Sequence, residues 1–316
     1  MGRDTARPVL PSPEQGALTF ANPKFLCLIL LVGLSACADE RPEPQASAIA
    51  SLVVVDDAGD TVRLAAPARR IVSLIPATTE LLFAIGAGDR LVGRTHWCDY
   101  PEAAASVPDL GDGMNPNLEA VVAARPDLVV LYLSGQNGGA AARLRGLGIP
   151  AIQVRSDLLA DVPRLARLFG RLTGGPAPAD SLAVRFDQEL TSATVPAPAD
   201  PPSVFLLVWD EPPMTVGRGS YLSELIERAG GINAYADLPT SSGQISVESA
   251  ASRDPDVILT LSETIPAFAL RPEWQVVDAV REQRFVRIAG SEFSRPGPRS
   301  PAAVRELSAA LAEAAP

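Results

Sequence analysis

Short apolar runs alternate with segments of helical spacing along most of the chain. Runs at 71–75 and 128–133 predict buried strands in the first half, and runs at 203–208 and 257–261 predict them in the second. Between residues 163 and 172, apolar side chains recur every three or four positions, which is typical of an amphipathic helix. Strands that alternate with helices predict α/β lobes with parallel sheets.

One stretch of the sequence occurs twice. Glu119 and Glu248 each stand seven residues before a Pro-Asp pair, at 126–127 and 255–256, and an apolar run follows both times. Each copy predicts a short helix, a stop at the Pro-Asp pair and a buried strand.

A second repeat lies upstream of the first. Glu80 stands six residues before Gly86, and Glu224 stands six residues before Gly230. Two repeats in the same order predict two related α/β lobes. A chain with two lobes and a cleft between them favours a binding protein over an enzyme.

We therefore divide the folded part of the chain into three regions. An N-terminal lobe covers residues 51–176, and a C-terminal lobe covers residues 203–316. A connecting helix is expected over 177–202, because apolar residues recur four positions apart at Leu182 and Phe186.

The N-terminus has the pattern of a targeting segment. Positive charge precedes a short apolar run at 25–34, which is too short to serve as a stable membrane anchor. Leu34-Ser35-Ala36-Cys37 looks like a bacterial lipoprotein box, so we expect a signal peptide over 1–36 and lipid anchoring through Cys37. The alternative is an ordinary secretory signal with an incidental cysteine. Residues 37–50 are expected to form a flexible tether.

Composition narrows the function classes. The chain has 316 residues, of which 47% are hydrophobic, and this is enough for two domains of common size. Its formal net charge of -10 disfavours nucleic acid as a partner, because phosphates would be repelled. After removal of the signal peptide and lipidation of Cys37, Cys98 is the only thiol left, so no internal disulfide is expected.

Candidate ligand residues follow from the order of strands. In open α/β sheets, ligands bind beyond the carboxyl ends of the strands, and this rule selects three loops in each lobe. Aromatic residues are only 5% of the chain, yet two of its three tryptophans and its only histidine fall in these loops. Such loops suit a large, flat or partly apolar ligand with a few polar groups. The selected loops are residues 76–79, 94–100, 134–137, 209–211, 262–264 and 290–295.

Two residues of the 94–100 loop could ligate a metal. The imidazole of His96 could be an axial ligand to a metal carried inside a macrocycle, or His96 could be a hydrogen-bonded loop residue. Cys98 is more commonly a buried small apolar residue than a soft ligand. A chain with one histidine cannot build a site for a bare metal from several histidines, which weighs against a zinc or manganese receptor.

The repeated glutamates also have two interpretations. Asn117 and Ser246 can cap the helices that carry Glu119 and Glu248, and a carboxylate in the first turn of a helix is favoured by the helix dipole alone. The alternative is a matched pair of exposed acids, one in each lobe, that dock on basic residues of another protein. Their equal placement in duplicated lobes favours docking.

The sequence resembles a known family at several of these points. The run Arg70 to Glu80 (RIVSLIPATTE) resembles the opening of periplasmic binding proteins of the iron-siderophore and vitamin B12 class, which serve ABC importers. The segments Cys98-Asp99-Tyr100-Pro101, Gly113-Met114-Asn115 and Leu118-Glu119 are most similar to the cobalamin-binding branch. The resemblance extends from about Val53 to the C-terminus.

This resemblance implies an architecture and a set of partners. It implies the class III fold, in which two Rossmann-like lobes are joined by a single long helix. It implies a monomer on the periplasmic or extracytoplasmic side of a membrane. It also implies that Glu119 and Glu248 meet arginines of an ABC permease dimer, which works with ATPase subunits.

The resemblance and the loop rule together give the expected ligand residues. Trp97 falls where the B12 receptor has a contacting aromatic, Tyr132 falls near another, and residues 291–295 match a second contact segment. A tryptophan expected shortly before Glu119 is missing, since Gly111-Asp112-Gly113 stands there. The full expected set is Pro76, Ala77, Thr78, His96, Trp97, Tyr100, Tyr132, Trp209, Ser291, Glu292, Phe293 and Arg295.

The sequence therefore predicts a lipid-anchored solute-binding protein, not an enzyme, that delivers a corrinoid to an ABC importer and has no cofactor of its own. The departures from the B12 receptor leave haem or a ferric siderophore as alternative ligands. A chelatase-like enzyme that uses the same cleft is the alternative from another class. It would need a general base or a metal in the cleft, and Asp99, Asp210 and Glu292 show no pairing pattern for that role.

Overall fold

The computed structural model describes residues 52–196, 198–262 and 264–314. The predicted signal peptide, the lipidated Cys37 and the tether at 37–50 lie outside the described residues, so these three remain predictions.

A four-stranded parallel sheet forms the centre of the first lobe, in the strand order β4-β3-β5-β6. A hairpin of two antiparallel strands precedes it, and Asp56 closes the hairpin turn by accepting hydrogen bonds from the backbone of Ala58 and Asp60. The strands are β1 (Leu52–Val55), β2 (Thr61–Leu64), β3 (Ile71–Ser73), β4 (Leu91–Arg94), β5 (Leu128–Tyr132) and β6 (Ala151–Val154).

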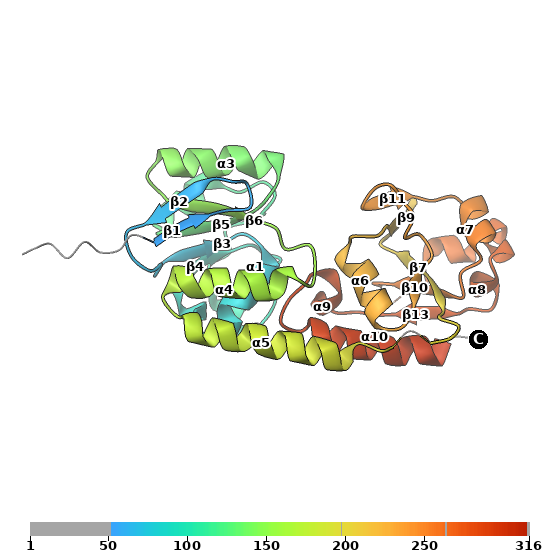
Figure 1. Ribbon diagram of the computed structural model, residues 1–316. Helices are drawn as coiled ribbons and strands as arrows, with labels where there is room; N and C mark the ends of the chain where they lie inside the picture. The colour runs from blue at the N-terminus through green and yellow to red at the C-terminus, as the bar shows by residue number, and fades with distance from the viewer. Residues whose placement is uncertain (1–51, 197, 263, 315–316) are drawn as a thin grey trace, which may run out of the picture. The chain divides into compact units, whose positions relative to one another are not determined.

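Helices cover both faces of this sheet (Figure 1). Leu128 and Val130 of β5 pack with one set of helices, whereas Val129 and Leu131 pack on the other face, as the two-residue repeat of a strand requires. The helical segments are α1 (Pro76–Ala84), η1 (Gly88–Arg90), η2 (Glu102–Ser106), α2 (Leu118–Ala123), α3 (Gly135–Gly146) and α4 (Asp161–Thr173).

Helix α3 corrects the prediction that 134–137 is a loop. The helix runs from Gly135 to Gly146 and contains four glycines, which disfavour a helix and hid it in the sequence. Ser134 caps the helix by accepting a hydrogen bond from the backbone of Asn137 at 3.1 Å, and Ala141 and Leu144 are fully buried against the sheet. Packing on the sheet therefore overrides the weak helix propensity.

The second lobe repeats the parallel sheet and adds an antiparallel one. The parallel sheet has the strand order β10-β7-β12-β13, and the antiparallel sheet, which the sequence did not predict, has the order β11-β9-β8. The strands are β7 (Ser203–Leu207), β8 (Trp209–Asp210), β9 (Pro213–Val216), β10 (Ile232–Asn233), β11 (Ser242–Gln244), β12 (Val257–Thr260) and β13 (Phe285–Arg287).

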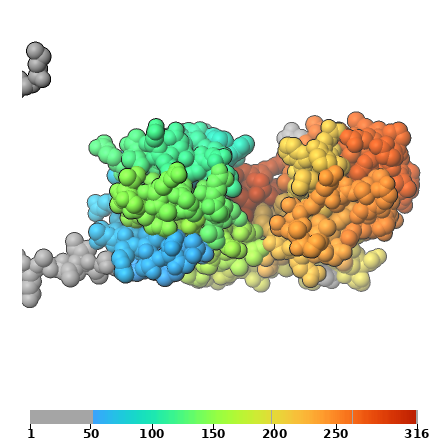
Figure 2. Space-filling model, turned by 90° about the horizontal axis from the view of Figure 1, so that it is seen from above, coloured from blue at the N-terminus to red at the C-terminus, as the bar shows by residue number. Residues whose placement is uncertain are grey.

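Helices again lie on both faces of the parallel sheet. Residues 272–281 form two short helical segments, because the backbone is extended at Val277 between them. The helical segments are α6 (Tyr221–Arg228), α7 (Val247–Arg253), η3 (Ala267–Leu270), η4 (Pro272–Val276), α8 (Asp278–Arg281), α9 (Ser291–Ser294) and α10 (Ser300–Ala314). Figure 2 shows the first lobe in blue to green and the second in yellow to red, each as a continuous body.

The connecting helix α5 (Pro176–Ala193) is shorter than the predicted span of 177–202. Its C-terminal end is at Ala193, and the prolines that follow cannot continue a helix. Beyond it, the backbone N–H of Val195 donates to the carbonyl of Arg228 at 2.9 Å. The end of α5 is thus fixed on α6 of the second lobe.

A shared hydrophobic core joins the lobes as well. One cluster of buried side chains contains Leu128 and Phe169 of the first lobe, Phe186 of α5, and Leu225 and Leu307 of the second lobe. The lobes are therefore held together by packing along α5 and α10 in addition to the chain connection. Among the described residues, none of the helices has the length and apolarity needed to cross a membrane.

Candidate functional site

A cavity of about 590 Å³ lies where loops of the two lobes meet. The first lobe contributes the turn after β3, the loop after β4 and the loop after β6, and the second lobe contributes the segment around α9. All four follow the carboxyl ends of parallel strands, as expected for an α/β sheet. The lining residues are Ile75, Pro76, Ala77, Trp97, Asp99, Ser156, Gly290, Ser291, Ser294 and Arg295.

Two further cavities share lining residues with the first. One, of about 360 Å³, shares Ser156 and Ser294 with it and also lies between the lobes. The other, of about 280 Å³, belongs to the first lobe and shares Ile75, Pro76 and Trp97. We call the three cavities together the interlobe cleft.

One wall of the interlobe cleft is aromatic and apolar. Trp97 is 63% exposed, and its ring lies 4.6 Å from the ring of His96. Tyr132 lines two of the three cavities, and Met114 stands beside it in the cavity of the first lobe. The exposed indole and the neighbouring apolar side chains can stack on a flat ligand.

Tyr132 is held in a fixed orientation. Its hydroxyl donates to Asp157 Oδ1 at 2.7 Å. Burial, together with the hydrogen bond to the Asp157 carboxylate, raises the pKa of Tyr132 to about 12. The side chain is therefore a neutral phenol at physiological pH and acts as a wall of the cleft rather than as a phenolate.

A glycine lines the apolar cavity of the first lobe. Gly113 packs so closely on the end of β3 that a Cβ atom there would lie 2.1 Å from the carbonyl oxygen of Leu74. The resemblance expects a tryptophan in this region, and the compact Gly111-Asp112-Gly113 segment leaves the space open instead.

The polar side of the cleft is an ion-pair network. Arg295 donates to Asp99 and lies 3.8 Å from Glu80. Arg299 donates to both carboxylate oxygens of Glu80, at 2.9 and 3.0 Å, and to Glu292. These contacts link α1 and the loop after β4 in the first lobe to the segment between α9 and α10 in the second.

The structure places six of the predicted ligand residues on the interlobe cleft and the others elsewhere. The predicted residues that line the cleft are Pro76, Ala77, Trp97, Tyr132, Ser291 and Arg295. His96, Tyr100 and Glu292 are outside this lining. The Arg299 guanidinium instead lies over the ring of Tyr100, 3.8 Å from its centroid. Glu292 accepts a hydrogen bond from the same guanidinium.

Two predicted ligand residues require correction, because their side chains are fully buried. The hydroxyl of Thr78 lies 2.7 Å from Ser73 Oγ and donates to the carbonyl of Ile75. Phe293 packs in the hydrophobic core next to α10. Thr78 lies in α1 and Phe293 lies in α9. Successive side chains of a helix point in different directions, so these two face the interior while their neighbours line the cleft.

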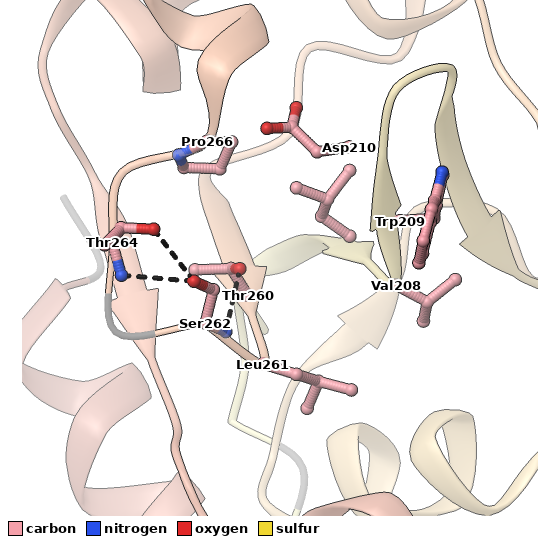
Figure 3. Close-up of a pocket in the computed structure, with 9 residues that line it drawn as sticks. Val208, Trp209, Asp210, Thr260, Leu261, Ser262, Thr264 and Pro266 are labelled. Carbon is pink, nitrogen blue, oxygen red and sulfur yellow. Dashed lines mark hydrogen bonds between the residues drawn. The ribbon is translucent and has the colours of Figure 1, made fainter.

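Trp209 lines a different cavity of about 230 Å³ in the second lobe (Figure 3). It is 62% exposed, and its indole N–H donates to the carbonyl of Glu211. Opposite it, Ser262 is hydrogen-bonded to Thr260 and Thr264. A role of Trp209 in ligand binding remains a prediction.

Several residues of the interlobe cleft were not predicted from the sequence. Ser156 and Asp157 follow β6, and applying the strand-end rule to that strand as well would have selected them. Ser220 and Ser241 reach the cleft beside the unforeseen antiparallel sheet, so no sequence signal was available for them.

Cys98 is enclosed in the first lobe. The Cys98 thiol is buried and lies 3.2 Å from the hydroxyls of Thr79 and Thr95, which agrees with a structural role. The described part of the chain contains no cluster of three or more His, Cys, Asp or Glu side chains that could hold a metal ion.

The repeated glutamates occupy equivalent positions. Glu119 and Glu248 are exposed in the first turns of α2 and α7, and Asn117 and Ser246 cap these helices as predicted. The hydrogen bond from Ser246 lowers the pKa of Glu248, so its carboxylate is charged at neutral pH.

Comparison with known proteins identifies relatives of the same architecture. The chain is 28% identical over 299 residues to an uncharacterized ABC transporter substrate-binding lipoprotein, YvrC, of Bacillus subtilis, covering 91% of this chain and 94% of the relative. The crystal structure of the periplasmic vitamin B12 binding protein BtuF of Vibrio cholerae is similar with a TM-score of 0.68 and 27% identity, over 78% of this chain and 98% of that one.

A haem-binding protein is similar to the same degree. The periplasmic heme-binding protein RhuT of Roseiflexus sp. RS-1 has a TM-score of 0.69 and 26% identity, over 78% of this chain and 99% of that one. The architecture is thus the predicted class III fold. Residues 71–291 match the family described as periplasmic binding protein. The chain belongs to the periplasmic binding protein family, whose members bind solutes rather than act as enzymes.

Proposed function

We propose that this protein binds a corrinoid in the interlobe cleft and delivers it to an ABC importer from the extracytoplasmic side. The observation that carries the proposal is the set of three adjoining cavities with an aromatic wall at Trp97 and Tyr132 and a polar side at Arg295. A flat macrocycle can stack on the indole while its polar side arms meet the serines and the ion pairs.

Similarity to proteins of ABC import systems supports the transport role. The Bacillus relative is named as a substrate-binding lipoprotein of an ABC transporter, and the Vibrio neighbour is a vitamin B12 binding protein. The main cavity of about 590 Å³ also falls within the range of about 300–1,000 Å³ that is typical of small-molecule sites.

Haem is the main alternative ligand, and a ferric siderophore is the other. The similarity to a heme-binding protein favours haem at the level of fold and sequence. Haem and corrinoids are both flat metal chelates, so the aromatic wall alone suits either. The exposed carboxylate of Asp99 in the main cavity favours the corrinoid, whose side arms are mostly amides.

The partners follow from the same proposal. We infer that Glu119 and Glu248 dock on basic residues of a permease dimer, which in turn works with ATPase subunits. Lipidation of Cys37, supported by the lipoprotein relative, would keep the protein at the membrane. We expect the anchored protein to act as a monomer.

Calorimetric titration of the full chain with cobalamin, cobinamide, haemin and a ferric siderophore tests the ligand assignment. We expect the two corrinoids to bind most tightly. If every ligand of the panel binds more weakly than about millimolar, which is near -4 kcal/mol, the proposed function is wrong.

A further inference from the structure

Two charged side chains line the main cavity of the interlobe cleft, and they differ in exposure. The side chain of Arg295 is only 13% exposed, whereas that of Asp99 is 57% exposed. The guanidinium lies behind, hydrogen-bonded to the carboxylate, so the charge that a ligand meets first is negative. The sequence predicted Arg295 as a ligand residue, and in the structure its guanidinium is paired with Asp99.

In the network around the main cavity, both guanidinium groups already face carboxylates. Arg295 and Arg299 supply two positive charges, and Glu80, Asp99 and Glu292 supply three negative ones. Each guanidinium is already shared between two carboxylates. A ligand carboxylate that approached Arg295 would therefore meet the Asp99 carboxylate on the same guanidinium.

Asp99 remains ionised under ordinary conditions. Burial acts to raise its pKa, but the hydrogen bond and the charge of Arg295 outweigh burial, and the pKa lies below the usual value of an aspartate. At neutral pH the cleft therefore presents a permanent carboxylate, which accepts hydrogen bonds from N–H groups and repels other carboxylates.

The neighbouring groups fit the same chemistry. Ser156, Ser291 and Ser294 line the cavity around the ion pair. Hydroxyl groups can both donate and accept, so with Asp99 they can satisfy the N–H and C=O groups of primary amides. A ligand periphery made of amides matches this set better than a periphery made of carboxylates.

We propose that Asp99 is a specificity-determining residue that selects chelates with amide side arms over chelates with carboxylate side arms. This inference rests on the proposed function and concerns the same site. We call the proposed preference for amide over carboxylate side arms the charge rule. The exposed carboxylate of Asp99 would distinguish the two kinds of chelate by repelling carboxylate side arms. A neutral residue at this position should therefore allow carboxylated ligands to bind more tightly.

The test compares two corrins that differ in these side arms. Cobinamide carries amides and cobyrinic acid carries carboxylates on the same corrin ring. Dissociation constants are measured by calorimetry at pH 7.5 for the full-length wild type and for Asp99→Asn, which keeps the size of the side chain. The matched control is Asp89→Asn, which removes one charge from an exposed position outside the lining of the cleft.

We expect the wild type and Asp89→Asn to bind cobinamide at least about tenfold more tightly than cobyrinic acid. In Asp99→Asn the preference should fall by about tenfold or more, mainly because cobyrinic acid binds better. High salt should reduce the wild-type preference as well, since it screens partly exposed charges. A preference that is unchanged in Asp99→Asn overturns the inference.

A second ligand pair separates this inference from the proposed function. Haemin and its dimethyl ester, measured in the same way, apply the charge rule to a different ring. One outcome is that neither corrin binds, but the wild type binds the ester more tightly than haemin and Asp99→Asn loses this preference. In that case the corrinoid proposal fails and the charge rule stands. If corrins bind with no dependence on Asp99, only the charge rule fails, and if no ligand binds, both fail.

Discussion

Tyr132 illustrates how one residue limits the chemistry of the cleft. Its hydroxyl donates to Asp157, and its pKa is raised to about 12 by burial and by that carboxylate. Its contribution to binding should therefore come from the ring and not from the hydroxyl.

We predict that Tyr132→Phe changes the dissociation constant for cobinamide by less than about threefold. Tyr132→Ala should weaken binding about tenfold, since an aromatic contact adds about 0.5–1.5 kcal/mol beyond area burial. Calorimetry measures both. A loss in Tyr132→Phe as large as that in Tyr132→Ala would show that the hydroxyl matters, contrary to this account.

At the residue scale, the sequence identified the correct loops but not the direction of each side chain. Residues 76–78 were all expected at the ligand, yet Pro76 and Ala77 line the cleft and Thr78 is buried. The difference follows from the start of α1 at Pro76, because successive residues of a helix point about 100° apart. A pattern that assigned this stretch to a loop could not separate them.

At the scale of elements, the repeated Pro-Asp pairs have a structural function. Asp127 accepts hydrogen bonds from the backbone of Arg69 and Arg70 just before β3. Asp256 accepts one from the backbone of Ser203 at the start of β7, at 2.7 Å. In each lobe, the aspartate before one central strand therefore holds the beginning of the neighbouring central strand.

We predict that Asp127→Ala and Asp256→Ala each reduce the free energy of unfolding by about 1–2 kcal/mol, because a backbone N–H loses a charged acceptor. Urea denaturation measures the loss. Asp187→Ala, at an exposed position of α5, should change stability by less than about 0.5 kcal/mol. Equal effects of the three variants would contradict the assigned role.

Elements with strong patterns were predicted well, and those with weak patterns were not. The runs at 128–133 and 257–261 contain the buried strands β5 and β12, as predicted. Strands β8 and β11 have only two and three residues, which is too short for a two-residue pattern to be recognised. Consequently the part of the cleft next to this sheet could not be foreseen.

At the scale of the whole molecule, the upstream repeat contributes contacts between the lobes. Glu80 of the first lobe pairs with Arg299 of the second through two hydrogen bonds, and its side chain is only 3% exposed. Glu224 of the second lobe accepts a hydrogen bond from the backbone of Leu159 of the first, at 2.7 Å. The two equivalent acids thus each reach into the opposite lobe.

We predict that Glu80→Ala lowers the free energy of unfolding by about 3 kcal/mol, because it leaves the partly buried Arg299 without its main partner. Glu224→Ala should cost about 1 kcal/mol, since it loses a single hydrogen bond to the backbone. Both are measured by urea denaturation. A loss below about 1 kcal/mol for Glu80→Ala would show that the pair does not hold the lobes together.

Docking is also a property of the whole molecule, since it requires one glutamate from each lobe. We predict that Glu119→Arg combined with Glu248→Arg abolishes uptake of labelled cobalamin in cells that carry the cognate importer, while the dissociation constant for cobinamide stays unchanged. The control is Glu189→Arg with Glu306→Arg, which makes the same charge change at exposed positions of α5 and α10. Normal uptake in the docking double variant would refute the role.

The most direct test of the central claim is a competition between the two main ligand classes. The full chain is mixed with equal amounts of cobinamide and haemin in excess, separated from free ligand by gel filtration, and measured by absorption spectroscopy. We predict that the protein retains about one corrin per chain and little haem, because the aromatic wall accepts either ring and Asp99 disfavours the haem carboxylates. A protein fraction that carries haem, or neither chromophore, would contradict the account.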